Sequence, residues 1–224
     1  MKKILISTIG LLLFFTGCSN LKKDSEIKVV KYNNSKVDLK YTIVNDDSII
    51  IETLNNGDDV DYASINLAAY NSNNELLGVE KQYLHSLVNG QKNLIKISLN
   101  DFISNDDKVS KIELKIKPKK YEKNIEKSFI SNIEGKIEST DDKDQIKLTL
   151  TNNSGVVIDN LNAAVVFTKN GKMVDIYNVN VQSMNDTYSE NIYVPLSENK
   201  DGTVSYVDYD DTSVIVNYAI SYTE

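Results

Sequence analysis

The sequence predicts an all-β protein whose body consists of two tandem antiparallel β-sandwiches. Three observations support this fold class: apolar residues alternate with polar ones from Ile27 onward, turns rich in Asn and Gly interrupt the alternation, and the series of strands and turns recurs about 97 residues later. Alternation with a period of two is typical of half-buried strands, because successive side chains point to opposite faces.

The chain opens with an export signal. Two lysines precede an apolar run that ends at Phe15, and Gly17 and Cys18 follow the run. A basic, an apolar and a cleavage region in this order predict a signal peptide, here residues 1–17. The run is too short for a permanent anchor, since a membrane-spanning helix needs about 20 apolar residues.

The end of this signal, Phe15-Thr16-Gly17-Cys18, resembles the lipobox of bacterial lipoproteins, with Phe15 where the pattern has leucine. The resemblance implies that cleavage occurs before Cys18 and that Cys18 carries a diacylglycerol thioether, with palmitate among its acyl chains. The body would then be held on the extracytoplasmic face of the cell membrane, because several buried acyl chains give stable anchoring. The alternative is a soluble secreted protein in which Cys18 is incidental.

Residues 18–26 are polar and predict a flexible tether.

Composition restricts the partners of the body. Without residues 1–17 the chain keeps 23 basic and 32 acidic side chains, a formal charge of −9. Nucleic-acid binding needs clustered basic residues along the phosphate backbone, so a general nucleic-acid binder is excluded. Cys18 is the only cysteine, and the body therefore has no disulfide.

The predicted strands repeat along the chain. Asn55, at the end of one alternating segment, lies 97 residues before Asn152, at the end of another, and the residues around them match in type. Between Val60 and Tyr70 an offset of 98 fits better. Each copy would hold about seven short strands, which is the profile of an immunoglobulin-like sandwich.

The second copy carries a further resemblance. Its strand end Val165-Val166-Phe167 and the following hairpin Lys169-Asn170-Gly171-Lys172 are similar to FxLYD-type modules of bacterial envelope lipoproteins, although the Leu-Tyr-Asp of that family is absent. The resemblance implies an immunoglobulin-like architecture. The predicted boundaries are a signal peptide at 1–17, a lipidated tether at 18–26, a first sandwich at 27–117, a linker at 118–123 and a second sandwich at 124–224.

Residues after the linker fit two structures. Tyr121, Ile125, Phe129 and Ile133 are spaced four apart, as on one face of a helix. The repeat instead aligns Phe129 with Tyr32, which places it in the first strand of the second sandwich. We favour the strand.

Candidate catalytic residues are few. His85 is the only histidine, no Gly-x-Ser-x-Gly turn is present, and Ser197 and Lys200 match Ser-x-x-Lys in a turn context rather than at a helix start. Zinc sites usually need several His or Cys ligands. We expect no catalytic residue, no cofactor and no metal site, and we interpret His85 as structural. An enzyme whose carboxylates converge only in the folded chain stays open as an alternative.

Two patterns suggest small ligands. The first is an EF-hand-like spacing, in which the first and last residues are poor calcium ligands, so an acidic surface loop is the preferred interpretation. The second, Tyr218 and Tyr222 on one strand, is similar to the haem-ligating strand of NEAT domains. We expect Val214, Val216 and Ile220 on the same face, which predicts core instead. The EF-hand-like residues are Ser197, Asn199, Asp201, Gly202 and Asp208.

Lysines concentrate in one stretch of this acidic chain. Lys108–Lys127 carries eight of them against three glutamates. Electrostatic attraction acts close to an anionic surface, so Lys119 and Lys120 are candidate partner-binding residues for lipid headgroups or wall polymer phosphates. The alternative is an edge strand protected by lysines.

The sequence as a whole favours a non-catalytic binding or accessory protein of the bacterial cell surface. Its anchor would be the lipid on Cys18, and its partner a protein or a cell-wall polymer, met by the lysine stretch or by end loops, which often carry recognition. Two alternatives remain: a lipoprotein that captures haem or a metal, and an envelope hydrolase. The pattern leaves the oligomeric state open. The candidate loops are 55–61, 152–159 and 197–211.

Overall fold

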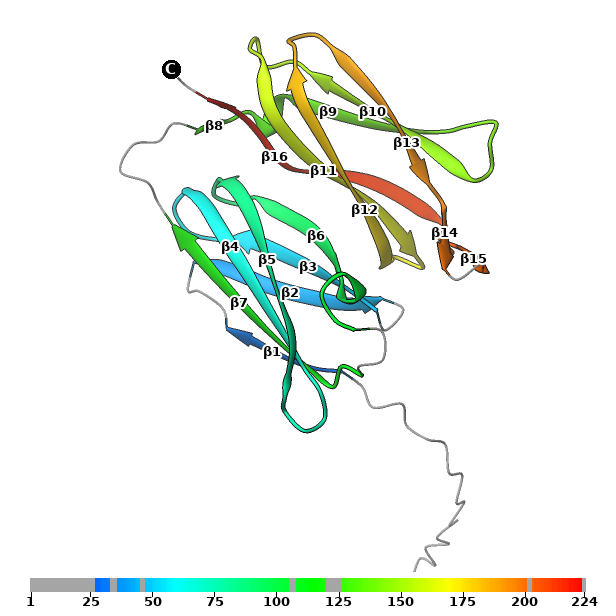
Figure 1. The fold of residues 1–224 in the computed structure, drawn as a ribbon. Helices are drawn as coiled ribbons and strands as arrows, with labels where there is room; N and C mark the ends of the chain where they lie inside the picture. Colours follow the sequence, from blue (N-terminus) through cyan, green and yellow to red (C-terminus); the bar gives the residue numbers. More distant parts are fainter. Residues whose placement is uncertain are drawn as a thin grey trace, which may run out of the picture.

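The computed structural model describes residues 27–32, 36–44, 47–104, 108–119, 126–200 and 203–222. In these segments the chain forms sixteen β-strands and two 3₁₀-helices of three residues each, so the predicted all-β class is confirmed. The strands gather into two stacked halves (Figure 1). Cys18 and Lys120 lie outside the described residues, as do the predicted signal peptide and tether.

The first half contains two facing sheets. One has the strand order β1-β7-β4-β5 and the other β2-β3-β6. Connections pass from one sheet to the other after β1, β3, β5 and β6. The 3₁₀-helix η1 (Leu99–Asp101) follows β6. The strands are β1 (Lys28–Tyr32), β2 (Val37–Val44), β3 (Ser48–Asn55), β4 (Val60–Tyr70), β5 (Leu76–Leu87), β6 (Lys92–Ser98) and β7 (Lys111–Lys119).

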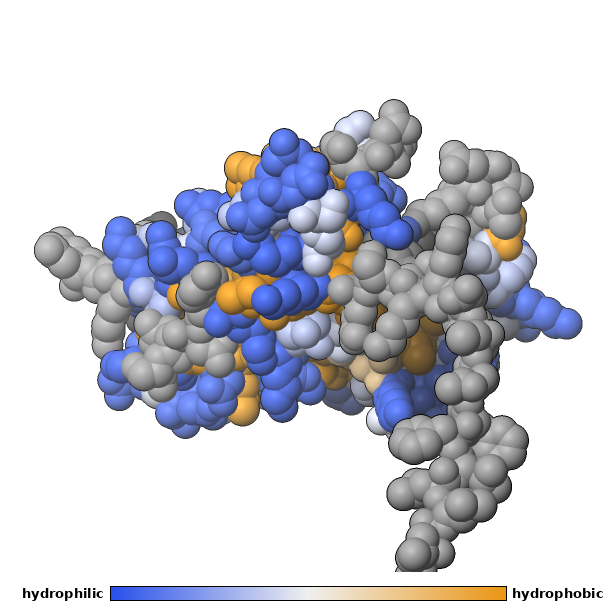
Figure 2. Space-filling model, turned by 90° about the horizontal axis from the view of Figure 1, so that it is seen from below, coloured by the Kyte–Doolittle hydropathy of each residue, from blue (hydrophilic) through white to orange (hydrophobic). Residues whose placement is uncertain are grey.

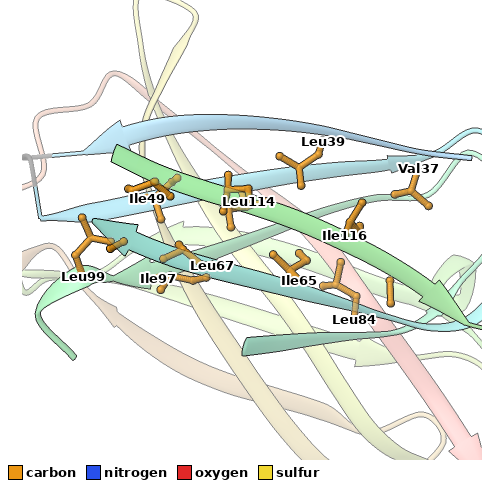
Figure 3. Packing of buried hydrophobic residues seen from close by; sticks show 14 of the residues in the cluster. Val37, Leu39, Ile49, Ile65, Leu67, Leu84, Ile97, Leu99, Leu114 and Ile116 are labelled. Atoms are coloured by element: carbon orange, nitrogen blue, oxygen red, sulfur yellow. The ribbon is translucent and has the colours of Figure 1, made fainter. Parts of the chain in front are cut away.

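The core of the first half lies between these sheets. Alternate residues of each strand point inward, as the period of two predicts, and Figure 3 shows Ile49, Leu67 and Leu114 converging from three strands. All three are at most 1% exposed. Full burial of such a side chain contributes about 1.5–3 kcal/mol, so this cluster supplies the main stabilisation of the first half.

The second half repeats the arrangement. Its sheets have the orders β12-β11-β16-β8 and β13-β10-β9, which match the first half strand for strand, and β14 and β15 form an added hairpin. The elements are β8 (Glu126–Ser128), η2 (Ile130–Asn132), β9 (Ile133–Ser139), β10 (Gln145–Asn152), β11 (Ile158–Lys169), β12 (Lys172–Met184), β13 (Ser189–Pro195), β14 (Ser197–Lys200), β15 (Thr203–Tyr206) and β16 (Asp211–Tyr222).

Backbone geometry also repeats at the offset of 97. Ser86 and Ser183 both have positive φ, at 48° and 54°, and so do Gly90 and Thr187, at 76° and 60°. Non-glycine residues rarely adopt this conformation. Its recurrence at equivalent positions shows that the two halves share local turns as well as strand order.

Two details of the first half differ from the prediction. β1 runs parallel to β7, with Lys28 opposite Lys111, so this sheet is not purely antiparallel. The two strands are far apart in sequence, and no short hairpin fixes their direction. β7 also continues through Pro118 to Lys119, which places the start of the predicted linker inside a strand.

Pro118 is tolerated in β7 for a geometric reason. It pairs with Ala63 of β4, while β1 ends at Tyr32, opposite Lys115. Within the described chain, β7 therefore has a neighbour on only one side at Pro118. A missing backbone N–H costs little where a strand has an unpaired side.

The favoured strand after the linker is confirmed in part. β8 covers Glu126–Ser128, and Ile133 opens β9, but Phe129 leads into the single 3₁₀ turn η2 between them. Tyr121 and Ile125 lie outside the described residues.

The two halves share a buried interface whose partner residues no local sequence pattern specifies. Val44, Ile50 and Leu94 of the first half pack against Ala164, Val166 and Ile176 of the second half, and all six side chains are at most 7% exposed. Because apolar burial on this scale stabilises contact between the halves, they form one body in the structure.

Asparagine side chains complete this interface. Asn217 accepts a hydrogen bond from the Leu94 backbone N–H and donates one to the Leu94 carbonyl, both at 2.7 Å. Asn178 bonds the Leu94 carbonyl and the Lys96 N–H, at 2.9 and 3.0 Å. The exposed edge of a sheet leaves backbone groups without partners, and these two side-chain amides supply them along β6.

Candidate functional site

The predicted lysine stretch forms part of a sheet face. Ile112, Leu114 and Ile116 of β7 are buried, so Lys115 and Lys117, which directly follow Leu114 and Ile116, point away from the core, and both are exposed. β7 lies between β1 and β4. Lys115 lies where both neighbours are present, so protection of a sheet edge does not explain it, whereas Lys117 and Lys119 lie beyond the end of β1, where β7 pairs only with β4.

A groove runs along the middle of this outer face. The outward side chains of β4 are short: Ser64, Asn66 and Ala68. Longer side chains flank them, because Asn66 pairs with Lys81 of β5 on one side and with Lys115 of β7 on the other. The resulting hollow has a volume of about 580 Å³. The hollow is lined by two lysines, two glutamates and four uncharged residues: Lys81, Lys115, Glu80, Glu113, Asn66, Leu67, Ala68 and Val79.

Tyrosines lie beyond both ends of the groove, on the same outward face. At one end Tyr62 lies 6.1 Å from Tyr83 between ring centroids, and the Lys119 ammonium lies 5.7 Å from the Tyr62 ring. At the other end the Lys111 ammonium lies 4.3 Å from the Tyr70 ring. Aromatic rings beside ammonium groups offer apolar and cationic contacts side by side.

The positive charge is concentrated toward the Tyr62 end. At the Tyr70 end, Lys111 forms an ion pair with Glu113 at 3.0 Å and donates to Asn74 at 2.8 Å. By contrast, Lys81, Lys115 and Lys117 make no ion pair with any described carboxylate.

The charge of Lys81 is reinforced by its neighbour. A hydrogen bond with Tyr83 raises the pKa of Lys81 above its ordinary value, which keeps this ammonium charged. Lys81 and Lys115, which line the groove beside Glu80 and Glu113, and Lys117 next to it are therefore cations without an ion pair to a described acid.

The equivalent face of the second half is a contact surface. There Ala164 of β11 pairs with Asn178 and Ile215, just as Asn66 of β4 pairs with Lys81 and Lys115. Ala164 is fully buried against the first half. The repeat thus buries this face in an internal contact in one copy and lines it with lysines in the other.

The remaining predicted residues lie elsewhere. His85 of β5 packs edge-on against Tyr218 of β16, with ring centroids 5.2 Å apart, at the junction of the halves. The side chain of Tyr222 is 46% exposed, and its hydroxyl accepts a bond from Asn160. Lys119, the described member of the predicted partner-binding pair, lies at the Tyr62 end of the groove.

The prediction that Val214 and Val216 share one face of β16 with Tyr218 is wrong. A register shift opposite Asn162 and Ala163 leaves Asn217 as an extra residue in β16. A bulge of this kind reverses the alternation beyond it. Val214 and Val216 therefore pack in the second core, while Tyr218, after the bulge, faces His85 instead.

The EF-hand-like segment is not a loop along its whole length. Ser197–Lys200 is strand β14, paired with Thr203–Tyr206, so the predicted turn context of Ser197 is also wrong. Asp208 forms an ion pair with Lys169, and Asp210 accepts a bond from the Asn170 N–H at 2.7 Å. Asp201 and Gly202 lie outside the described residues. Among those described, no three His, Cys, Asp or Glu side chains gather as metal ligands.

Two smaller hollows lie in or near the second half. One, of about 370 Å³, spans the junction beside the Lys96–Asp175 ion pair, and the other, of about 410 Å³, runs along Asn178, Asn180 and Gln182 of β12. Neither lies beside the lysines of β7. Seen from below, the visible surface is mostly hydrophilic, with hydrophobic residues in small areas between (Figure 2). The groove on β4 is therefore the best-defined candidate site.

Sequence reasoning located one wall of this site and missed the rest. The lysines of β7 stand out by their number, whereas Lys81 and Tyr83 come from a strand whose pairing the sequence does not specify. One usable signal was the small outward residues of β4 between Tyr62 and Tyr70.

Comparison with known proteins does not assign the chain to a family. No protein-family model matches the chain, and no curated protein matches it. In the described part of the chain, no helix has the length and apolar character needed to cross a membrane. The functional argument therefore depends on the geometry of the groove.

Proposed function

We propose that the protein is a non-catalytic binding lipoprotein of the bacterial cell surface, anchored through Cys18, and that the groove on β4 is its contact surface for an anionic envelope component. The observation that carries this proposal is the groove itself. Lys81 and Lys115 line it and Lys117 lies next to it, on a face whose equivalent in the second half packs against the first half. Attraction between such a patch and an anionic surface is strongest close to the membrane.

We also propose that each half is an immunoglobulin-like domain. Two facing sheets with crossing connections after β1, β3, β5 and β6 fit a Greek-key sandwich. The recurrence of this order in the second half supports two copies of one domain. Such sandwiches commonly act as rigid carriers of binding surfaces.

The anchor is tested by replacing Cys18. Cys18→Ala removes the thiol that would carry the lipid, so we expect the protein to appear as uncleaved precursor or in the medium. Fractionation of the cells with an antibody against the body measures this. Retention of Cys18→Ala on the membrane at the normal level would contradict the lipid anchor.

The contact surface is tested by reversing charge beside the groove. We expect Lys119→Glu with Lys120→Glu to weaken binding of the purified body to its cell envelope and to reduce the salt dependence of that binding. Lys169→Glu with Lys172→Glu, in the second half, is the matched control with the same change in net charge. Equal loss in both variants would contradict a specific role for the groove. Hydrolysis of an envelope polymer that depends on a buried carboxylate would contradict the non-catalytic assignment.

A further inference from the structure

We infer that the groove binds a single extended strand of a phosphodiester polymer, laid lengthwise along β4. This inference rests on the proposed function and specifies the chemistry of the partner. It draws on the shape of the groove, the spacing of its charges and the type of its polar groups.

The shape favours a linear chain over a flat surface. On β4 the groove is floored by Asn66, Leu67 and Ala68, between the longer side chains of β5 and β7. A narrow chain that follows β4 reaches this floor, whereas a layer of lipid headgroups meets only the tips of the walls.

The spacing of charge fits a repeating anion. Lys115, Lys117 and Lys119 alternate along β7, which places their Cα atoms about 6.6 Å apart. Lys81 stands on the opposite wall, across β4 from Lys115. A chain lying over β4 therefore passes between ammonium groups on both sides. A polymer with one phosphate for each short polyol unit presents charge at similar intervals.

The polar groups of the groove suit a phosphate polymer. All 25 basic residues of the chain are lysines, and lysine binds phosphate as a compact point charge. The Asn66 amide, which lines the groove, adds a group that can bond polyol hydroxyls.

A second copy of the chain fits the groove less well. By the repeat, the surface that would seat on it is the outer face of the β13-β10-β9 sheet. That face carries Lys147, Thr149, Asn191 and Tyr193, and Lys147 forms an ion pair with Glu138 at 3.7 Å. Its charges are mixed and offer no excess of anions to the groove's lysines.

The test measures binding of the full mature chain, carrying Cys18→Ala to keep it in solution, to a synthetic glycerol phosphate oligomer. We expect binding whose logarithm falls with the logarithm of salt concentration, with a slope of about 3 for four lysine contacts and a loss of about 0.7 in slope for Lys117→Gln. Lys172→Gln, with the same change in net charge, is expected to leave the slope unchanged. Ala68→Trp fills the floor without changing charge and is expected to weaken binding about tenfold, while Ala68→Ser is neutral.

Three outcomes would overturn the inference. Equal or tighter binding of polygalacturonate would contradict the phosphate assignment. Binding to phosphatidylglycerol vesicles, unaffected by Ala68→Trp and without binding of the oligomer, would assign the lysines to a membrane surface and leave the proposed function intact. Absence of binding to all three probes would contradict both proposals. Circular dichroism confirms that Ala68→Trp is folded, and Lys117→Gln tests the same groove without added bulk.

Discussion

Asn55 and Asn152 show the repeat at the scale of single atoms. Each side chain is fully buried. Its amide donates to two backbone carbonyls, and its oxygen accepts from a backbone N–H two residues on, at distances between 2.9 and 3.1 Å in both halves. A buried side chain with three backbone partners fixes the turn after its strand. These two residues therefore set the loops that follow β3 and β10.

Replacing Asn152 by Asp tests this role with a change of one atom. The new oxygen faces the carbonyls of Val156 and Met184, so we expect a loss of about 3 kcal/mol in the free energy of unfolding at neutral pH. The burial would raise the folded-state pKa of this carboxyl above its unfolded value, so the loss grows as pH rises above about 4 and shrinks below it.

Urea denaturation at several pH values measures this effect. Asn153→Asp is the matched control, because Asn153 is exposed, and its expected effect is within about 0.5 kcal/mol. A stable, pH-independent Asn152→Asp variant would show that the buried amide does not hold the turn.

At the scale of residues, the sequence predicted that Asn55 and Asn152 lie at turns, but not that their side chains are buried. Asn-rich turns after Asn55 and Asn152 follow from the preference of asparagine for turns. Their hydrogen bonds to Leu87 and Met184 join residues 32 apart in sequence, and no local pattern specifies such a partner.

At the scale of elements, the groove and the interface arise from the same position in the repeat. The outward face of β4 is polar and short, while that of β11 carries Ala164 and Val166 and is buried. β6 meets this buried face with its backbone edge, which Asn178 and Asn217 cover. A few side chains thus decide whether one face is an internal contact or an open surface.

Asn217→Leu tests the cover on the β6 edge. Leucine is similar in size but leaves the buried Leu94 N–H without its acceptor, so we expect a loss of about 1–3 kcal/mol in the free energy of unfolding. Asn191→Leu, on the exposed face of β13, is the control and is expected to change stability by less than about 0.5 kcal/mol. Similar effects of the two variants in chemical denaturation would contradict the role of Asn217.

The sequence predicted where the strands lie, but not which strands pair with each other. The period of two located the strands because it reflects which side chains are buried. The parallel pairing of β1 with β7 and the bulge at Asn217 depend on strands far apart in the chain. The lysine wall was predicted from β7 alone, and its partner wall on β5 was not.

On the scale of the whole molecule, the halves behave as one body. The apolar cluster around Ile50, Leu94 and Val166 is buried as deeply as the two domain cores. Separation of the halves would expose these side chains to water. The groove therefore has a fixed position relative to the second half, and the two sandwiches present it as a single rigid surface.

The coupling predicts one cooperative thermal transition for the full mature chain. Ile176→Lys places a charge in the interface, so we expect it to split or broaden this transition and to lower its midpoint, because an unpaired charge is costly to bury. Lys172→Ile, an exposed change on the same strand, is the control. Calorimetry that shows two independent transitions for the unaltered chain would contradict the rigid arrangement.

The sequence contained a signal for this interface. Ala163–Phe167 and Ile49–Ile51 are continuous apolar runs without alternation. Continuous apolar runs are typical of strands that are buried on both faces. Each run packs against the core of its own half on one face and against the opposite half on its second face. The runs do not specify which surface packs on them, because any apolar face would bury their side chains equally well.

The most direct test of the groove is a map of backbone amide chemical shifts during titration with the glycerol phosphate oligomer. We expect the perturbed amides to cluster on Ser64–Ala68, Lys81–Tyr83 and Lys115–Lys119, with little change in the second half. Perturbations centred instead on β12 or on residues 197–211 would contradict the assignment of the binding surface to the lysine-lined groove.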